Sequence, residues 1–278
     1  MRRSILAPLL ALGALPLAAQ APLWTDPGAG SPGAWTFRAG AMAFASPAFP
    51  GSSKDRFLPL PVFSADYDGR VFLGSSLVSV GLGAGLRIVN SAHFSWDLGL
   101  GVGERRPERR ADELAGMGDR SPEAFLGTGV RVHGGGFHAA ASVASGLVQG
   151  AGARGTLSFG GGGRVSERML AGLGLSGVWG NAQNLAWDYG ITPEQAARRA
   201  ALLAAGDPRL KAGEAGPYAP KGGLKEVAAT GHLVLLLPSR WQLFWVLKAG
   251  SLQGDARTSP LVRRAGFASG GMGCSVRF

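Results

Sequence analysis

The sequence contains little cysteine and little charge, and beyond its first twenty residues it has no long apolar run. The single cysteine, Cys274, excludes an internal disulfide and a cluster of thiolate metal ligands. Charged residues make up only 17% of the 278 residues. No segment after residue 20 is apolar and long enough to cross a bilayer as a helix, so that class of membrane protein is excluded for the rest of the chain.

Acidic residues are scarce relative to basic ones. There are 28 Lys and Arg against 18 Asp and Glu, which gives a formal net charge of +10. A basic surface favours anionic partners such as nucleic acid, anionic lipid or a polyanionic polymer. The basic residues are spread singly, apart from "RRPERR" at 105–110, so no stripe for nucleic acid is formed and we expect no nucleic-acid partner.

Glycine, by contrast, is abundant, with 46 residues and no Gly-X-Y period. Glycine at this level disfavours helices and suits turns, close strand approach and barrels. Hydrophobic residues make up 46% of the chain, a value typical of folded globular proteins rather than of disorder.

The N-terminus has the pattern of a secretory signal peptide over residues 1–20. Arg2 and Arg3 form a short basic segment, residues 5–19 are apolar, and small residues for cleavage follow: Ala18, Ala19 and Ala21. A membrane anchor is the alternative, although the run is shorter than the about 20 residues that a spanning helix needs. After the signal we expect a short periplasmic segment over 21–33.

The rest of the chain, residues 34–278, alternates between large apolar residues and small or polar ones. In "FSWDLGLGVG" (94–103) the even positions are large and apolar, and the odd positions are Ser, Asp or Gly. Successive side chains of a strand point to opposite faces, so this is a strand with one apolar side. The other side is too small for a core and too weakly polar for a hydrated surface, which is typical of a barrel with its apolar face in lipid.

This pattern recurs in about twelve segments of roughly ten residues, the length that a tilted membrane strand needs. Short joints such as "DG" at 68–69 mostly alternate with long ones such as 104–121 and 181–222, although the third joint is tight. We therefore predict an all-β fold, a single antiparallel transmembrane β-barrel of about 12 strands with long extracellular loops and short periplasmic turns. The predicted strands are 33–44, 57–67, 69–79, 81–90, 93–103, 122–133, 135–147, 152–164, 167–180, 223–237, 240–251 and 265–278.

The long segment 181–222 contains one predicted helix, in "TPEQAARRAALLAAG". Thr192 is a candidate N-cap, followed by Pro193 at the first helical position and Gln195 two residues later, and Gly206 would stop the helix. We expect the helix either over or inside the barrel mouth, or exposed on the loop.

Residues for catalysis or cofactor binding are hard to find. His133 and His138 flank a predicted turn and could share a metal, but exposed turn histidines are the favoured interpretation. No serine lies in a Gly-x-Ser-x-Gly elbow, and "GGGGR" at 160–164 lacks the ending of a phosphate loop. The sequence therefore predicts no enzyme, no catalytic residue, no metal site and no cofactor.

Charged residues instead point to surfaces and to the barrel interior. Arg105, Arg106, Arg109 and Arg110 lie in a predicted outer loop, where the guanidinium groups can pair with lipopolysaccharide phosphates or remain solvated. The alternation also predicts inward-facing charges that would bias a pore toward anions: Arg87, Asp97, Arg131, Lys248 and Arg277. About twelve strands leave open whether the lumen is filled or forms a channel, and the inner glycines favour room for a pore.

Several stretches resemble the MltA-interacting protein (MipA)/OmpV outer-membrane family. They are "SPAFPGSSKDRFLPLPVFSADYDGRVF" (46–72), "YGITPEQAA" (189–197), "GGLKEV" (222–227), "GDARTSPLV" (254–262) and the closing "SVRF". Two departures stand out: Phe49 occupies a position where the family usually has tyrosine, and residues 200–217 are longer than the usual link.

The resemblance implies a non-enzymatic barrel in the outer membrane of a Gram-negative cell. It implies a scaffold for murein enzymes, with a lytic transglycosylase and a murein synthase as partners, besides outer-membrane lipid and lipopolysaccharide. A narrow, anion-favouring pore and a surface adhesin built on loops 104–121 and 181–222 are the alternatives.

The last residues fit the same resemblance, because barrels of this class end in a strand with a C-terminal aromatic residue that the barrel assembly machinery recognises. The chain stops on Phe278 within an alternating run. We therefore predict a closing strand and a sorting signal formed by Cys274, Val276 and Phe278.

Overall fold

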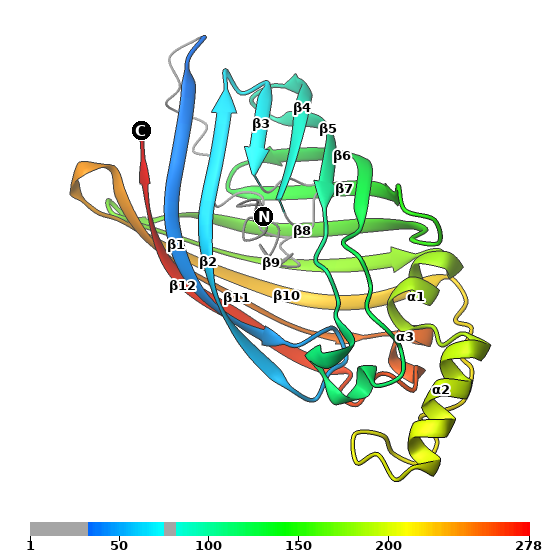
Figure 1. The fold of residues 1–278 in the computed structure, drawn as a ribbon. Helices are drawn as coiled ribbons and strands as arrows, with labels where there is room; N and C mark the ends of the chain where they lie inside the picture. The colour runs from blue at the N-terminus through cyan, green and yellow to red at the C-terminus, as the bar shows by residue number, and fades with distance from the viewer. Residues whose placement is uncertain (1–32, 75–81) are drawn as a thin grey trace, which may run out of the picture.

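The computed structural model describes residues 33–74 and 82–278. The predicted signal peptide, and the segment after it up to residue 32, lie outside these residues. Twelve strands in the described ranges form a closed barrel, with β12 pairing back onto β1 (Figure 1). Every neighbouring pair is antiparallel, so the predicted antiparallel barrel is confirmed.

The strand boundaries agree with the predicted ones to within a few residues. The predicted third strand, 69–79, is described from residue 71 to residue 74, and its remaining part lies outside the described residues. The strands are β1 (Trp35–Pro47), β2 (Asp55–Tyr67), β3 (Val71–Gly74), β4 (Leu82–Asn90), β5 (Phe94–Val102), β6 (Ala124–Gly134), β7 (Phe137–Gly146), β8 (Ala153–Ser166), β9 (Met169–Gly180), β10 (Gly223–Leu236), β11 (Trp241–Leu252) and β12 (Gly266–Arg277).

The two ends of the barrel differ, as the alternation of joints predicted. Five short turns join the strands at one end, and the long loops within the described residues, such as 103–123 and 181–222, lie at the other. One short reversal is at Asp68–Gly69, where both residues have positive φ angles of 52° and 66°. That geometry is a type I′ turn, and glycine in its second position avoids a Cβ clash.

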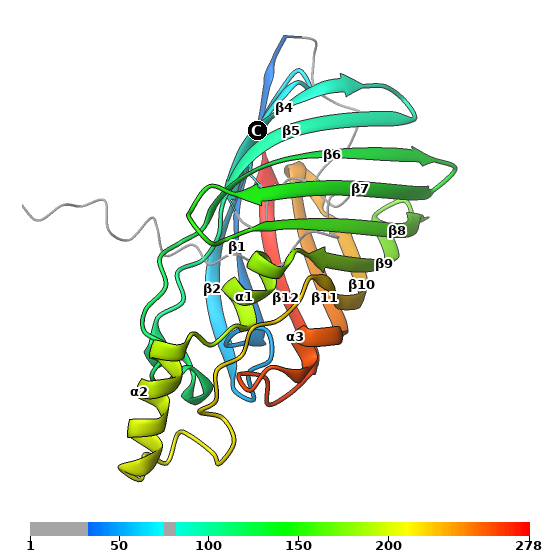
Figure 2. The same ribbon diagram turned by 90° about the vertical axis from the view of Figure 1, so that its right-hand side faces the viewer.

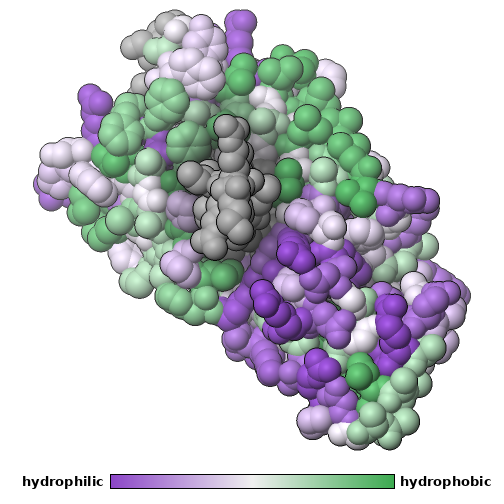
Figure 3. All heavy atoms as spheres, in the orientation of Figure 1, coloured by the Kyte–Doolittle hydropathy of each residue, from purple (hydrophilic) through white to green (hydrophobic). Residues whose placement is uncertain are grey.

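The outer face of the wall carries the large apolar side chains. On β5, Trp96, Leu98 and Leu100 are 42%, 41% and 52% exposed, whereas the alternate residues Ser95 and Asp97 are buried. The same arrangement continues around the barrel, with further exposed residues such as Phe63, Leu126, Phe159, Leu173 and Leu247. Figure 3 shows these apolar areas over the strands and a hydrophilic region over the loops.

The inner face is less open than its glycines suggested. An apolar cluster from β1, β2, β10 and β11 fills part of it, formed by Met42, Phe44, Leu60, Val234, Phe244 and Val246. A Cβ on Gly273 would lie 2.5 Å from the Phe244 ring, and one on Gly271 would lie 2.8 Å from the Phe44 ring. The β12 glycines thus leave room for neighbouring side chains to lie across them rather than for a wider lumen.

The helices lie at the long-loop end of the barrel. They are α1 (Ala182–Tyr189), α2 (Pro193–Ala204) and the short α3 (Gly254–Thr258). The predicted helix is α2, and its Thr192–Gln195 capping box is formed in both directions. α2 extends away from the strands (Figures 1 and 2). Among the described residues, no helix is both long and apolar enough to span a bilayer.

Candidate functional site

Four long loops pack against one another beyond the strand ends and form a layer that we call the loop cap (Figure 2). It consists of residues 48–54, 103–123, 181–222 and 253–265. The loop cap has its own apolar core, separate from the barrel, made of Ala48, Phe49, Ala111, Leu114, Met117, Ile191, Ala196 and Leu261. All four loops contribute to this core, so they hold one another in place.

Arg199 on α2 connects the loops from inside the cap. Its side chain is fully buried, and it donates hydrogen bonds of 2.8 Å to the backbone carbonyls of Glu113, Ala115 and Glu214. Burial lowers the pKa of Arg199, partly offset by the nearby Glu214 carboxylate. Carbonyl acceptors stabilise this cation because its charge strengthens each bond.

Two carboxylates add further links between the loops. Glu113 is fully buried and accepts hydrogen bonds from Ser53, with its backbone N–H at 2.7 Å and its hydroxyl at 2.6 Å. Glu214 pairs in a bidentate manner with Arg263 Nε and Nη2, at 2.8 and 2.7 Å. Burial raises the pKa of Glu214, but the hydrogen bonds from Arg263 and Lys211 outweigh it, and the net pKa is lowered.

Beneath the cap, at the strand ends, a group of charged side chains surrounds the end of α1. We call it the mouth cluster. It contains four cations and two carboxylates, which are Arg106, Arg120, Arg154, Lys225, Glu123 and Asp188. The residues come from two loops and two strands, so the closed barrel and the packed cap together create this group.

Asp188, near the end of α1, is the anion at the centre of the mouth cluster. Its carboxylate lies 2.9 Å from Lys225 Nζ and 3.8 Å from Arg120 Nη1, and its backbone carbonyl accepts a hydrogen bond from Arg106 at 2.8 Å. Burial raises the pKa of Asp188, but Lys225, Arg120 and Arg106 outweigh it and lower the pKa. Asn184 on α1 also accepts a hydrogen bond from Lys225, at 2.8 Å.

The cations of the mouth cluster are crowded. Burial, followed by repulsion from Arg120, lowers the pKa of Arg106 to about 9. Burial also lowers the pKa of Arg120 and raises that of Glu123. Both directions follow from removing charges from water.

The four arginines of "RRPERR" do not form one surface. Arg105 and Arg109 are exposed, and Arg105 pairs with Asp119 at 2.5 Å. Arg106 belongs to the mouth cluster, and Arg110 pairs with Glu104 at 2.7 Å. A contact with lipopolysaccharide therefore stays a prediction, and only the exposed Arg105 and Arg109 are placed to form it.

The five charges expected in the lumen lie on the inward-facing positions of their strands. Arg87 contacts Asp97 at 3.4 Å, and Lys248 pairs with Glu226 at 2.6 Å. Arg131 Nε has no hydrogen-bond partner among the described residues, while Arg277 lies opposite Arg38 in the register of β1 and β12.

Sequence reasoning missed further inward charges, among them Arg56, Arg154 and Lys225. Arg56 forms a bidentate pair with Glu104, at 2.5 and 2.7 Å. Strand parity could have found Arg56 and Arg154, because each lies at an inward position near a strand end, whereas Lys225 lies at a β-bulge that interrupts the alternation.

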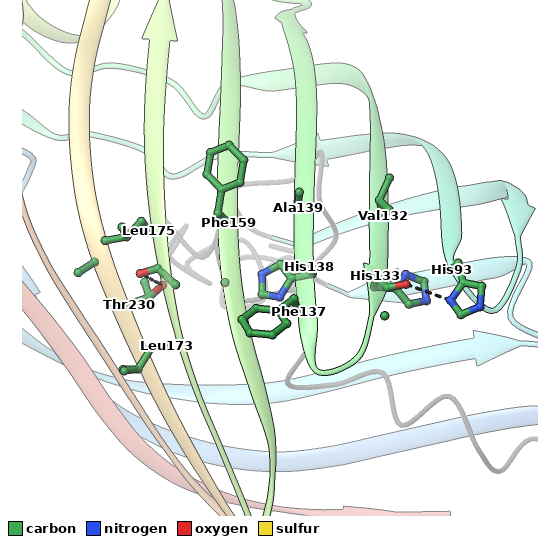
Figure 4. Close-up of a pocket in the computed structure, with 14 residues that line it drawn as sticks. His93, Val132, His133, Phe137, His138, Ala139, Phe159, Leu173, Leu175 and Thr230 are labelled. Atoms are coloured by element: carbon green, nitrogen blue, oxygen red, sulfur yellow. Dashed lines mark hydrogen bonds between the residues drawn. The ribbon is translucent and has the colours of Figure 1, made fainter.

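The histidines lie near the short turns. His133 and His138 are direct cross-strand partners, and His93 Nδ1 lies 3.3 Å from the His133 carbonyl oxygen (Figure 4). A hollow of about 990 Å³ adjoins them, but its lining includes Phe137 and Leu173, each 74% exposed on the apolar outer face. In the described part of the chain, no group of three or more His, Cys, Asp or Glu side chains is arranged to hold a metal ion.

The C-terminal residues of the predicted sorting signal lie along the seam that closes the barrel. Cys274 and Val276 pair with Ala41 and Ala39 of β1. Phe278 continues the pairing, because its backbone N–H donates to the Phe37 carbonyl at 2.9 Å, and its side chain is 63% exposed.

Comparisons with solved structures find bacterial outer-membrane proteins. An outer membrane channel from Pseudomonas putida F1 is 11% identical, with 91% of this chain and 100% of that chain covered and a TM-score of 0.44. The channel DcaP of Acinetobacter baumannii is 7% identical, with 88% and 97% covered and a TM-score of 0.39. In-vitro folded OmpT of Vibrio cholerae is 10% identical with a TM-score of 0.35; 78% of this chain is covered, but only 60% of that chain.

These likenesses are too distant to carry an argument about function. No curated protein sequence matches the chain. The family model described as MltA-interacting protein MipA, however, matches residues 39–278, which include all of β2 to β12 and most of β1. The chain therefore belongs to the MltA-interacting protein MipA family.

Proposed function

We propose that this chain is an integral protein of the Gram-negative outer membrane, exported through its signal peptide. The observation that carries the proposal is the apolar outer face of a closed barrel with an even number of strands. Aromatic residues gather near the short-turn end of that face, where a membrane interface would lie: Trp35, Phe37, Tyr67, Trp96, Trp241 and Phe278. The short turns then face the periplasm and the loop cap faces outward.

Within that membrane, we propose a non-enzymatic scaffold for murein-hydrolysing and murein-synthesising enzymes. Support comes from the family match, whose name refers to interaction with the lytic transglycosylase MltA. It also comes from the inner wall, where apolar side chains fill space that a wide channel would need. On the periplasmic side, the surfaces available are the five short turns and the chain before residue 33.

Site-specific photo-crosslinking tests the scaffold. A photoreactive residue would be placed at one of three turn positions, Ser91, Glu167 or Ser239, and a control at Lys211 in the loop cap. With a lytic transglycosylase present in the periplasm, we expect crosslinks from at least one turn and none from Lys211. No crosslink from any turn, nor from residues 21–33, would contradict a scaffold of this kind.

A narrow, anion-favouring pore is a second candidate, supported by the excess of cations over carboxylates in the mouth cluster. Conductance of the folded protein in a planar bilayer tests it, alongside a deletion of residues 192–217 closed by a short glycine linker. Ile191 and Tyr218 already exchange two backbone hydrogen bonds of 2.9 Å, so the deletion joins residues that are neighbours. Conductance steps with the full chain would show a pore. Conductance steps only with the deletion variant would show that residues 192–217 plug the pore. No conductance with either protein would reject conduction.

A further inference from the structure

Two arginines of the mouth cluster lack close anionic partners. Arg120 Nη1 lies 3.8 Å from Asp188, and Arg154 Nη1 lies 3.9 Å from Glu123. Both distances exceed the range of a hydrogen bond, so Asp188 and Glu123 accept no hydrogen bond from these guanidinium groups. Arg154 Nη2 is buried and has no hydrogen-bond partner within the described ranges. A buried, unpaired charged donor is costly, and native structures usually satisfy it.

Aromatic rings hold both guanidinium groups in place. Arg120 lies over the Trp187 ring at 4.6 Å, and Arg154 lies over the Phe125 ring at 4.4 Å. Stacking uses the face of a guanidinium group, while its N–H groups point outward in the plane and stay available to a ligand. Because Trp187 belongs to α1 and Phe125 to β6, the positions of both arginines depend on the folded barrel with its cap.

The charge balance of the cluster also favours an additional anion. Four cations face two carboxylates, and Asp188 is already engaged by Lys225 at 2.9 Å. Burial and the neighbouring Arg120 lower the pKa of Arg106 to about 9, as expected where positive charges are crowded. An anion in the cluster would relieve this repulsion.

We propose that the mouth cluster binds a small phosphate-bearing anion at Arg154, whose buried Nη2 has no partner among the described residues, with Arg120, Arg106 and Lys225 supplying further positive charge. A phosphate dianion matches the charge excess, and its oxygens can accept paired N–H donors from the Arg154 guanidinium fork. This binding site goes beyond the scaffold function and does not depend on conduction through the barrel.

The enclosure of the cluster selects a small, soluble ligand. The side chains of Arg120, Arg154 and Lys225 are only 17%, 14% and 11% exposed. They lie on the inner side of the strand ends, beneath the loops that meet in the cap. A phosphate on a lipid headgroup would have to leave its leaflet to reach them, whereas a free phosphate or a phosphorylated small molecule can enter from water.

Isothermal titration of the folded, detergent-solubilised full chain with inorganic phosphate tests the site, with chloride at equal ionic strength as the reference anion. We expect saturable binding of phosphate and none of chloride. Arg120→Gln and Arg154→Gln should each weaken binding by about tenfold or more, the loss expected for a charge-assisted hydrogen bond. Arg154→Lys keeps the charge without the fork and should give an intermediate loss.

Arg109→Gln is the matched control, because it removes the same charge from an exposed position of the cap and should bind like the wild type. Heat-dependent mobility on a gel verifies that each variant is folded, and if Arg154→Gln fails to fold, Arg120→Gln and Arg154→Lys carry the test. No saturable phosphate binding by the wild type would overturn the proposal, and so would equal weakening by Arg109→Gln. Since the titration contains neither a bilayer nor murein enzymes, its result is independent of the scaffold and the pore.

Discussion

The barrel wall and the loop cap place their apolar residues on opposite sides. In the wall, Leu173 is 74% exposed on the outer face, whereas Leu261 in the cap is fully buried. The cap follows the rule of a soluble domain, because water surrounds it and apolar side chains leave water by packing together. The wall reverses that rule because lipid is the solvent that we propose for it. One chain is thus built for two solvents.

The polar groups of the two regions differ as well. In the cap, the buried Arg199 is held by backbone carbonyls, two from the loop 103–123 and one from its own loop. On the inner side of the wall, charges pair with side chains of neighbouring strands, as Lys248 does with Glu226. The cap therefore depends on contacts between loops, and the wall depends on contacts between adjacent strands. We expect that substitutions can destabilise one region without the other.

The largest expected effect comes from deleting Phe278, which we predict to block assembly of the wall. The deletion removes backbone hydrogen bonds with Phe37 at the closing seam and the proposed sorting signal. Outer-membrane levels measured by fractionation and immunoblotting should fall to near zero. Deleting residues 192–217 from the cap should leave those levels close to normal, so equal levels for both deletions would refute the proposed sorting signal.

Arg199→Met should open the cap without opening the barrel. It leaves three carbonyls in the cap without their donor, and each unsatisfied buried acceptor costs about 1–3 kcal/mol. Limited proteolysis should then cut within 181–222 while the barrel keeps its heat-resistant gel mobility. Arg257→Met, at an exposed position of α3, is the control and should stay resistant. If the barrel loses heat resistance together with the cap, the two regions form one cooperative unit.

A matched pair of leucines compares the two solvents directly. Leu261→Ala should lower the stability of the cap by about 2–5 kcal/mol, because the side chain is fully buried in a packed core. Leu173→Ala truncates a side chain on the outer face of β9 and should change stability far less. Denaturant titrations of the folded protein in lipid vesicles give both stabilities. Proteolysis monitors unfolding of the cap, and gel mobility monitors unfolding of the barrel. A larger effect at Leu173 would contradict the outward, lipid-facing assignment.

The smallest expected effect is a pH dependence confined to the cap. The pKa of Glu214 is lowered below its ordinary value of 4.5, so its pairing with Arg263 stabilises the cap above pH 4.5 and is lost as the pH falls below that value. Glu214→Gln keeps a neutral acceptor for Arg263 and should cost about 1 kcal/mol at neutral pH, the difference between a charged and a neutral hydrogen bond. Cap proteolysis measured from pH 3 to 7 should show a smaller pH dependence in this variant than in the wild type.

Local patterns were enough to predict much of this molecule. The period of two assigned the strands, because every second side chain of a strand faces the same way. The Thr192–Gln195 capping box located α2 from four consecutive residues. The alternation of short and long joints separated the turn end from the loop end, although the expected room behind the inner glycines is partly filled by Phe44 and Phe244.

Other features depend on contacts between residues far apart in the chain. Arg199 and Glu113 are 86 positions apart, and neither carries a sequence signal for burial. Arg106 and Arg110 turn inward while Arg105 and Arg109 stay exposed, because only the packed loops define an inside. The sequence by itself determined the strands, the capped helix and the two kinds of joint, since each follows from neighbouring residues. Only the tertiary structure decided the core of the cap and the mouth cluster, because closing the barrel brings distant loops and strand ends together.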